Sequence, residues 1–123
     1  MSRLCAAATI FMVRDVLKAV EHYRDVLGFR QKFVYGDPVF YGGVERDDVV
    51  IHLSANQTKR APGGGAIYIF VTEVDALYAE LKAKGAKTLN EPKSYPYGMR
   101  DFDVQDVDGN QISFGQESKA TKA

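Results

Sequence analysis

The sequence has no tryptophan, no net charge and one cysteine among its 123 residues. Cys5 has no partner for a disulfide within the chain. The 16 basic residues balance the 16 acidic ones, so neither nucleic acid nor an anionic membrane surface is an expected partner. No apolar run approaches the roughly 18 to 20 residues that a membrane-spanning helix requires. The N-terminus also lacks the pattern of a signal peptide, and we expect a cytoplasmic protein.

The chain does have enough apolar residues for a core without disulfides. Hydrophobic residues make up 46% of the sequence and aromatic residues 11%. A chain of this length buries roughly two thirds of the surface that its unfolded form exposes. We therefore expect a single domain over residues 1–123, with the polar tail 118–123 frayed.

The predicted elements occur in the same order twice. An apolar strand near residues 7–13 precedes a helix over Val16–Gly28, and three strands follow at Phe29–Tyr35, Val39–Glu45 and Asp48–Ser54. The second half repeats this order with a strand at Ala66–Val71, a helix at Glu73–Gly85 and further strands. The sequence thus predicts an α+β fold of two βαβββ repeats, residues 7–54 and 66–117, joined by the loop 55–65.

Residue alternation separates two faces of the predicted strands, because side chains i and i+2 share a face. One face is aliphatic or aromatic and forms the predicted core: Phe11, Val13, Ile51, Leu53, Ile67, Ile69, Val71, Phe102, Val104, Ile112 and Phe114. The other face mixes aromatic, acidic and hydroxyl groups, which a dry core would not contain: Ile10, Met12, Val50, His52, Ser54, Tyr68, Phe70, Asp101, Asp103, Gln111 and Ser113. A curved mixed sheet with this second face concave forms a ligand cleft. The alternative places Asp101 and Asp103 on a solvated edge strand.

Two glycine-containing segments suggest phosphate or calcium sites, but each has a simpler interpretation. Gly63-Gly64-Gly65 precedes a strand and lacks the helix of a phosphate-binding loop, which favours a flexible linker. Residues 106–110, Asp-Val-Asp-Gly-Asn, lack the glycine that a calcium loop needs later, which favours a hairpin turn. His22 lies on the first predicted helix, where a surface position is the simplest expectation.

Three motifs carry a resemblance to a known family. They are Phe-x-Val-x-Asp-Val at residues 11–16, His-Tyr-Arg-Asp-Val-Leu-Gly-Phe at 22–29, and the segment 97–110 that runs from Tyr-Gly-Met-Arg-Asp to Asp-Gly-Asn. Together they resemble the vicinal oxygen chelate superfamily, which includes glyoxalase I, extradiol dioxygenases, fosfomycin-resistance transferases and bleomycin resistance proteins. The resemblance implies the paired-repeat fold of this superfamily and leaves the activity open.

The resemblance also implies where a metal would bind. The positions that match the ligands of the metal-dependent members are Ala8, His52, Ala66 and Ser113. Alanine has no donor atom, whereas a catalytic metal normally needs about three protein ligands. We therefore expect no metal and no other cofactor. The open alternative is a divalent-metal-dependent lyase, isomerase or dioxygenase that holds its metal through His52, with Asp101 or Asp103 recruited beside it.

The remaining interpretation resembles the metal-free bleomycin resistance proteins. These are homodimers that sequester a flat cationic drug in two clefts. By this resemblance we expect a homodimeric small-molecule binding protein rather than an enzyme, with an aromatic or cationic ligand held by Phe33, Phe40, His52, Tyr68, Tyr97, Asp101, Asp103 and Ser113. Tyr97 with Phe33 and Phe40 would stack the ligand, and the acids would attract its charge. Two points stay open: Arg100 is a candidate to neutralise Asp101, and the cleft could be vestigial in a protein-association subunit.

Overall fold

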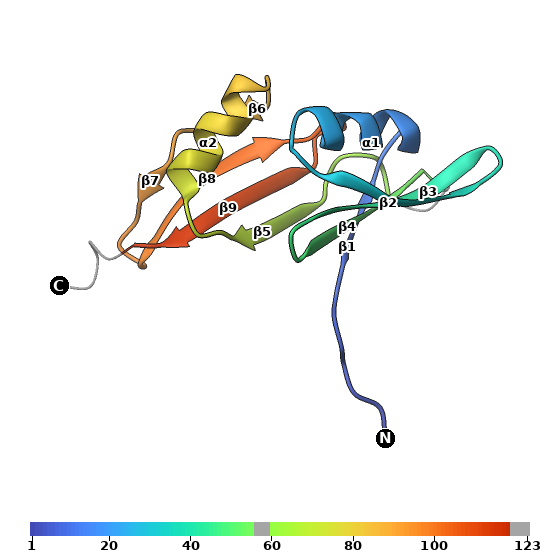
Figure 1. Ribbon diagram of the computed structural model, residues 1–123, viewed down its shortest axis with the longest axis horizontal. Coiled ribbons are helices and arrows are strands. Elements are labelled where there is room, and N and C mark those ends of the chain that lie inside the picture. The colour runs from blue at the N-terminus through green and yellow to red at the C-terminus, as the bar shows by residue number, and fades with distance from the viewer. Residues whose placement is uncertain (56–59, 119–123) are drawn as a thin grey trace.

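The computed structural model describes residues 1–55 and 60–118 (Figure 1). The first half contains β1 (Thr9–Met12), α1 (Val16–Asp25), β2 (Arg30–Gly36), β3 (Val39–Arg46) and β4 (Val49–Ser54). These strands form a four-stranded sheet in the order β1-β4-β3-β2. The strand β1 is parallel to β4, and the other neighbours are antiparallel.

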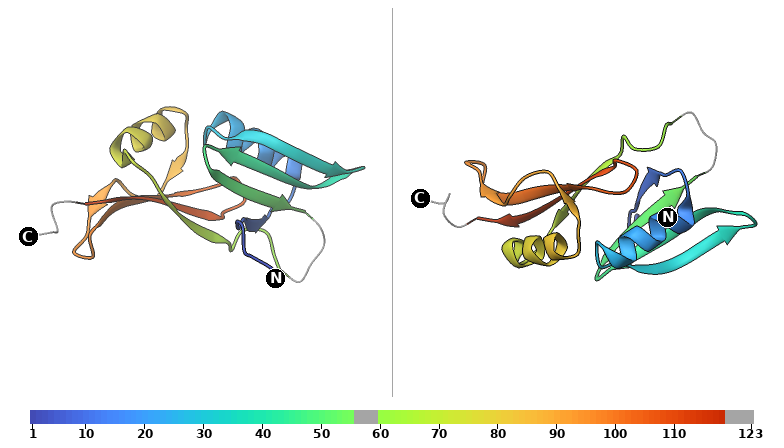
Figure 2. Two further views of the ribbon diagram at one scale, coloured as in Figure 1. Left: turned by 60° about the horizontal axis from the view of Figure 1, so that its bottom comes forward. Right: turned by 90° about the horizontal axis from the view of Figure 1, so that it is seen from above.

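The second half contains β5 (Ala66–Phe70), α2 (Val74–Ala83), the short strands β6 (Lys87–Thr88) and β7 (Lys93–Ser94), β8 (Met99–Gln105) and β9 (Gln111–Glu117). Its sheet has the order β5-β9-β8-β6, and β7 also pairs with β8. Again the first strand is parallel to the last, β5 to β9. The expected α+β class is confirmed, with the difference that the strands form two sheets, which lie end to end along the molecule (Figures 1 and 2).

The helix α1 forms where its apolar residues recur at helical spacing. Val16, Val20 and Tyr23 lie on one stripe and are 1%, 3% and 0% exposed. The carboxylate of Asp15 accepts a hydrogen bond from the Lys18 N–H at 3.1 Å and so caps the first turn. The helix ends at Asp25, earlier than predicted, and Gly28 follows with a φ of 76°.

The predicted core is confirmed for most of its members. Phe11, Val13, Ile51, Leu53, Ile69, Phe102, Val104, Ile112 and Phe114 are all buried. Ile67 and Val71 are half-buried and pack against this cluster. His22, expected on the surface, is also half-buried, and its Nε2 atom has no hydrogen-bond partner among the described residues. Burial lowers the pKa of His22 from its ordinary value.

The turn between β8 and β9 is a hairpin, as predicted, and it also joins the two halves. Asp106 is 5% exposed and accepts hydrogen bonds from the Tyr23 hydroxyl at 2.7 Å and from the backbone N–H groups of Asp108 and Asn110 at 2.9 Å. The Asn110 amide reaches the Met12 carbonyl of β1 at 3.2 Å. Because these groups are buried and paired, the turn fixes the second half against α1 and β1.

The glycines that precede β5 are held in place and do not form the free linker expected from the sequence. The Gly63 N–H donates to the Met12 carbonyl at 3.2 Å, and the Gly65 N–H donates to the Asn110 side chain at 3.0 Å. A Cβ at Gly63 would overlap the carbonyl oxygen of Asp108, and its φ of 77° disfavours other residues as well. Residues 56–59 of the predicted loop lie outside the described residues.

The two ends of the described chain are arranged differently from each other. Residues before β1 extend away from the two sheets (Figure 1), and Leu4 is 97% exposed. Ser118 is buried and its N–H donates to the Gly98 carbonyl at 2.8 Å. The rest of the predicted frayed tail, 119–123, lies outside the described residues. Within the described part of the chain, no helix is long and apolar enough to cross a membrane.

Candidate ligand-binding site

A carboxylate on β8, Asp101, is the centre of a polar cluster on the second sheet. The hydroxyl groups of Tyr68 and Tyr97 donate to its Oδ2 atom at 2.9 and 3.1 Å. Asp101 is only 9% exposed, whereas Tyr68 is 39% exposed and Tyr97 65%. Burial, followed by the hydrogen bond to Asp101, raises the pKa of both phenols, so both stay protonated as donors at neutral pH.

A glycine on β9 allows Tyr68 to reach Asp101. The strand β9 lies between β5, which carries Tyr68, and β8, which carries Asp101. Gly115 pairs with Asp101 across the β8–β9 ladder, and a Cβ at this position would overlap the phenol oxygen of Tyr68. The tyrosine ring therefore lies across the strand at the one point where no side chain projects.

Asp103 lies two residues further along the same face of β8. The Asn90 side-chain amide donates to Asp103 Oδ2 at 2.8 Å, and the Ser113 hydroxyl donates to Oδ1. The Asn90 carbonyl oxygen in turn accepts the Asp103 backbone N–H at 2.8 Å. Gln111 adds a longer contact of 3.4 Å to the Ser113 oxygen. Neutral groups thus satisfy the hydrogen-bonding capacity of Asp103 without cancelling its charge.

Arg100 does not neutralise Asp101, because its side chain lies on the opposite, helix-covered side of β8. Its guanidinium group donates to both carboxylate oxygens of Asp75 on α2 at 3.0 and 2.9 Å, and to the Ser94 hydroxyl at 3.3 Å. The hydrogen bonds and charge of Arg100 lower the pKa of Asp75. Among the described residues, neither Asp101 nor Asp103 forms an ion pair with lysine or arginine.

A second cluster surrounds His52 on β4 of the first sheet and is largely aromatic. The Tyr41 hydroxyl lies 2.8 Å from His52 Nδ1. The Phe33 and Tyr41 rings meet the imidazole edge to face at centroid distances of 5.3 and 5.4 Å, and they stack on each other at 6.1 Å. Here too a glycine lies beneath an aromatic ring, since Gly43 pairs with both Phe33 and His52 and a Cβ would overlap the Phe33 ring.

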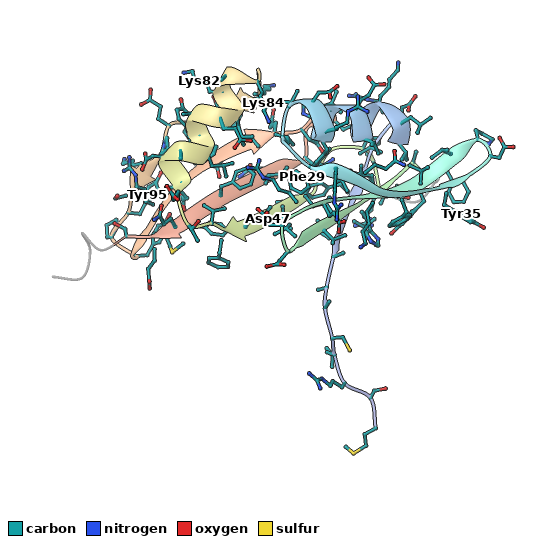
Figure 3. The ribbon with its side chains drawn as sticks, in the orientation of Figure 1. Phe29, Tyr35, Asp47, Lys82, Lys84 and Tyr95 are labelled. Atoms are coloured by element: carbon teal, nitrogen blue, oxygen red, sulfur yellow. The ribbon has the colours of Figure 1, made fainter. Side chains whose placement is uncertain are left out.

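Within one chain, Tyr97 does not lie beside Phe33 and Phe40, the rings expected to stack a ligand with it. Tyr97 instead stacks on Tyr95, with ring centroids 5.1 Å apart and planes 5° from parallel. Phe40 packs against Tyr35 at 5.6 Å, near the end of the β2–β3 hairpin. Figure 3 shows Tyr35 at the opposite end of the molecule from Tyr95. The eight predicted ligand residues therefore divide into two sets, one in each half of the chain.

Several residues of these clusters, Gly43 among them, could not be identified from the sequence. Tyr41 contacts His52, Asn90 contacts Asp103, and Gly115 makes room for Tyr68. Tyr41 lies in the strand predicted at Val39–Glu45, but its place beside His52 depends on the β3–β4 register, which the sequence does not give. Asn90 lies between the short strands β6 and β7, where alternation gives no information.

The residues at the expected metal positions do not fit a metal. Ala8 and Ala66 have no donor atom, and the described His52 and Ser113 lie on different sheets. His52 Nδ1 is within hydrogen-bond distance of Tyr41, and the Ser113 hydroxyl binds Asp103. In the part of the chain that the structure describes, no three His, Cys, Asp or Glu side chains are grouped to hold a metal ion. The residues at these four positions therefore do not provide the ligand set that metal-dependent members of the superfamily would need.

A comparison with protein families identifies the superfamily to which this fold belongs. The model of the Glyoxalase/Bleomycin resistance protein/Dioxygenase superfamily matches residues 6–114, which is most of the chain. The protein belongs to this superfamily. A comparison with curated proteins gives no match.

Solved structures of superfamily members have the same fold. The bleomycin-binding protein from Streptomyces verticillus, solved with copper(II)-bleomycin, is 28% identical, with a TM-score of 0.71 over 93% of this chain and 97% of that one. A superfamily member from Sphaerobacter thermophilus is 24% identical, with a TM-score of 0.78 over 93% and 98%. A glyoxalase-related enzyme from Clostridium phytofermentans is 19% identical, with a TM-score of 0.79 over 94% and 97%.

Proposed function

We propose that this superfamily member is a small-molecule binding protein that sequesters a flat, aromatic cation on the open faces of its sheets. The observation that carries the proposal is the pair Asp101 and Asp103. Two carboxylates lie on one face of β8, and neutral donors hold both of them. The nearest arginine in sequence, Arg100, is engaged by Asp75 on the other side. This arrangement leaves two negative charges available to a cationic ligand.

The aromatic groups beside these carboxylates suit a flat ligand. Tyr97 is 65% exposed and stacks on Tyr95, which fixes its ring plane and leaves one ring face accessible. A flat cation on that face would gain stacking and cation–π energy while its charge lies close to Asp101. The hydroxyl groups of Tyr68 and Tyr97 keep the carboxylate oriented before any ligand arrives.

A homodimer completes the proposed site. The His52 cluster and the Asp101 cluster lie on separate sheets, and large side chains near them are open to solvent: Phe70 is 77% exposed, Tyr35 67% and Ile10 40%. Apolar surface of this kind favours association with a partner, and a second copy is the commonest one. One chain would then supply the aromatic wall of a cleft and the other chain its carboxylates.

The comparison with known structures supports the ligand class. The Streptomyces verticillus protein, which is 28% identical, was solved with copper(II)-bleomycin. The proposed biological role is drug resistance in the cytoplasm, where the single thiol of Cys5 would stay reduced.

Isothermal titration calorimetry tests the proposal with two probes, metal-free bleomycin and 9-aminoacridine. We expect saturable binding of at least one probe, weakened about tenfold or more in an Asp101→Asn/Asp103→Asn variant, because the ligand charge loses both partners. Asp75→Asn is the matched control, since it removes a carboxylate from the helix-covered side. Absence of binding by both probes, or equal affinity in the double variant, contradicts the proposal. Sedimentation equilibrium tests the dimer, and a monomer at micromolar concentration contradicts it.

A further inference from the structure

We infer that the chain has a second binding site, in the cavity between its two halves, for a small organic cation with an apolar body. The cavity has a volume of about 470 Å³, which is within the usual range of small-ligand pockets. Its walls come from the β3–β4 turn (46–49), the end of β5 and the following residues (69–73), and α2. Figure 3 shows Phe29 and Asp47 at this junction. Most of its lining, including α2 and Phe114, lies on the helix-covered side, and Phe70 reaches its edge from the side of Tyr68.

The floor of this inter-repeat cavity is apolar. Phe29, Ile69 and Phe114 are core residues, only 4%, 7% and 4% exposed, and they line the cavity together with the half-buried Leu77 of α2. Hydrocarbon that enters the cavity would leave water and contact these side chains, which favours binding in proportion to the apolar area covered. The ligand therefore needs an apolar part.

The rim of the cavity is acidic and lacks a free cation. Its charged residues are Arg46 against Asp47, Asp48, Glu73 and Glu80. Arg46 is committed, because its guanidinium donates to both Glu80 oxygens at 2.9 Å and to the Leu27 carbonyl at 3.0 Å. The side chains of the other three acids are exposed and form no ion pair among the described residues. Their negative potential over an apolar floor complements an amphiphilic cation.

The Arg46–Glu80 ion pair holds the two walls of the cavity at a fixed separation. Arg46 ends β3 in the first half, and Glu80 belongs to α2 in the second half. The bidentate geometry gives this contact more rigidity than a single hydrogen bond would. Asp47, Asp48 and Glu73 take no part in this supporting contact, so these three acids can be changed without removing it.

The test is a titration with n-hexyltrimethylammonium, followed by the NMR methyl shifts of Ile69 and Leu77. We expect saturable shifts in the wild-type chain. In Asp47→Asn/Asp48→Asn/Glu73→Gln, the affinity for the probe should fall by about tenfold or more, because the cation loses three nearby charges. Asparagine tolerates the positive φ of 52° at residue 47, so the variant should fold. The control Glu21→Gln/Asp25→Asn/Glu91→Gln removes as many charges elsewhere and should bind like the wild type.

Several results would overturn the inference. One is the absence of saturable shifts at Ile69 and Leu77, and another is unchanged affinity in the rim variant. The third is equal binding of tetramethylammonium or n-hexyl sulfate, since the first lacks the apolar body and the second has the wrong charge. The Asp101→Asn/Asp103→Asn variant keeps the two proposals apart. It should bind n-hexyltrimethylammonium normally, and if it does not, the ligand occupies the open sheet face and the cavity inference fails.

Discussion

The two halves of the molecule each have a hairpin turn before their last strand, and the two turns differ in environment. In the second half, Asp106 is 5% exposed and is bound by Tyr23 of the first half. In the first half, the turn residues Asp47 and Asp48 are exposed at the rim of the inter-repeat cavity. The turn before the last strand therefore joins the two halves in the second half, whereas in the first half it carries exposed negative charges. Repeated folds permit this division because one copy is enough for each role.

The open faces of the two sheets show a similar contrast. Both have a glycine beneath an aromatic ring, Gly43 under Phe33 and Gly115 under Tyr68. The first ring reaches the imidazole of His52, whereas the hydroxyl of the second reaches the carboxylate of Asp101. In each half, a glycine makes room for the ring above it. The resulting surface is aromatic in the first half and acidic in the second.

The largest effect should come from removing the buried turn carboxylate. Asp106→Ala leaves the buried Tyr23 hydroxyl and the N–H groups of the turn without their acceptor, and we expect a loss of about 3 kcal/mol or more in the free energy of unfolding. Asp48→Ala, in the exposed turn of the first half, should change it by about 0.5 kcal/mol or less. Urea unfolding of both variants measures the difference, and equal losses would show that the two turns do not differ as described.

A smaller effect is expected from filling the space beneath Tyr68. Gly115→Ala forces the phenol away from Asp101, which should cost about 1 to 3 kcal/mol of stability and weaken binding of a cationic probe. The pKa of Tyr68, raised in the wild type, should fall towards its ordinary value of 10.0. Ultraviolet titration of the phenols measures this change. Gly43→Ala is the matched control in the first sheet, and it should leave the Tyr68 titration unaltered.

Much of this comparison could be predicted from the sequence. Helical spacing located α1, and strand alternation separated Phe102 and Val104 from Asp101 and Asp103, because both patterns depend on local geometry. The partners of those acids could not be predicted in the same way. Whether Arg100 turns to Asp101 or to Asp75 depends on where α2 packs, and that is set by contacts distant in sequence.

The contacts between the two halves could not be predicted from local sequence patterns for the same reason. The composition of the Asp-Gly-Asn segment predicts a turn, yet it does not indicate that Tyr23 donates to Asp106. The Arg46–Glu80 contact likewise joins residues that belong to different predicted repeats. Such contacts need the relative placement of the two sheets, and alternation within a strand carries no information on it.

The smallest effect should be the pH dependence of the Arg46–Glu80 contact. Arg46 lowers the pKa of Glu80, so the pair stabilises the fold above the ordinary glutamate pKa of 4.5, and this stabilisation is lost as the pH falls below it. Both side chains are about one third exposed, 29% and 34%, so we expect about 1 kcal/mol or less. Unfolding at pH 7 and pH 3 measures it in wild type and Glu80→Gln. The variant should lose less stability on acidification, and an equal loss would contradict the assignment.

The most direct test of the account is to locate a bound flat cation by NMR. With 9-aminoacridine added to the isotopically labelled chain, the account predicts saturable shifts at Tyr68, Asp101 and Asp103, the residues of the open face of the second sheet. Shifts confined to Asp47, Leu77 and the other residues of the inter-repeat cavity would show that this face does not bind the flat cation. That result would contradict the proposal that the carboxylates of β8 form the ligand site.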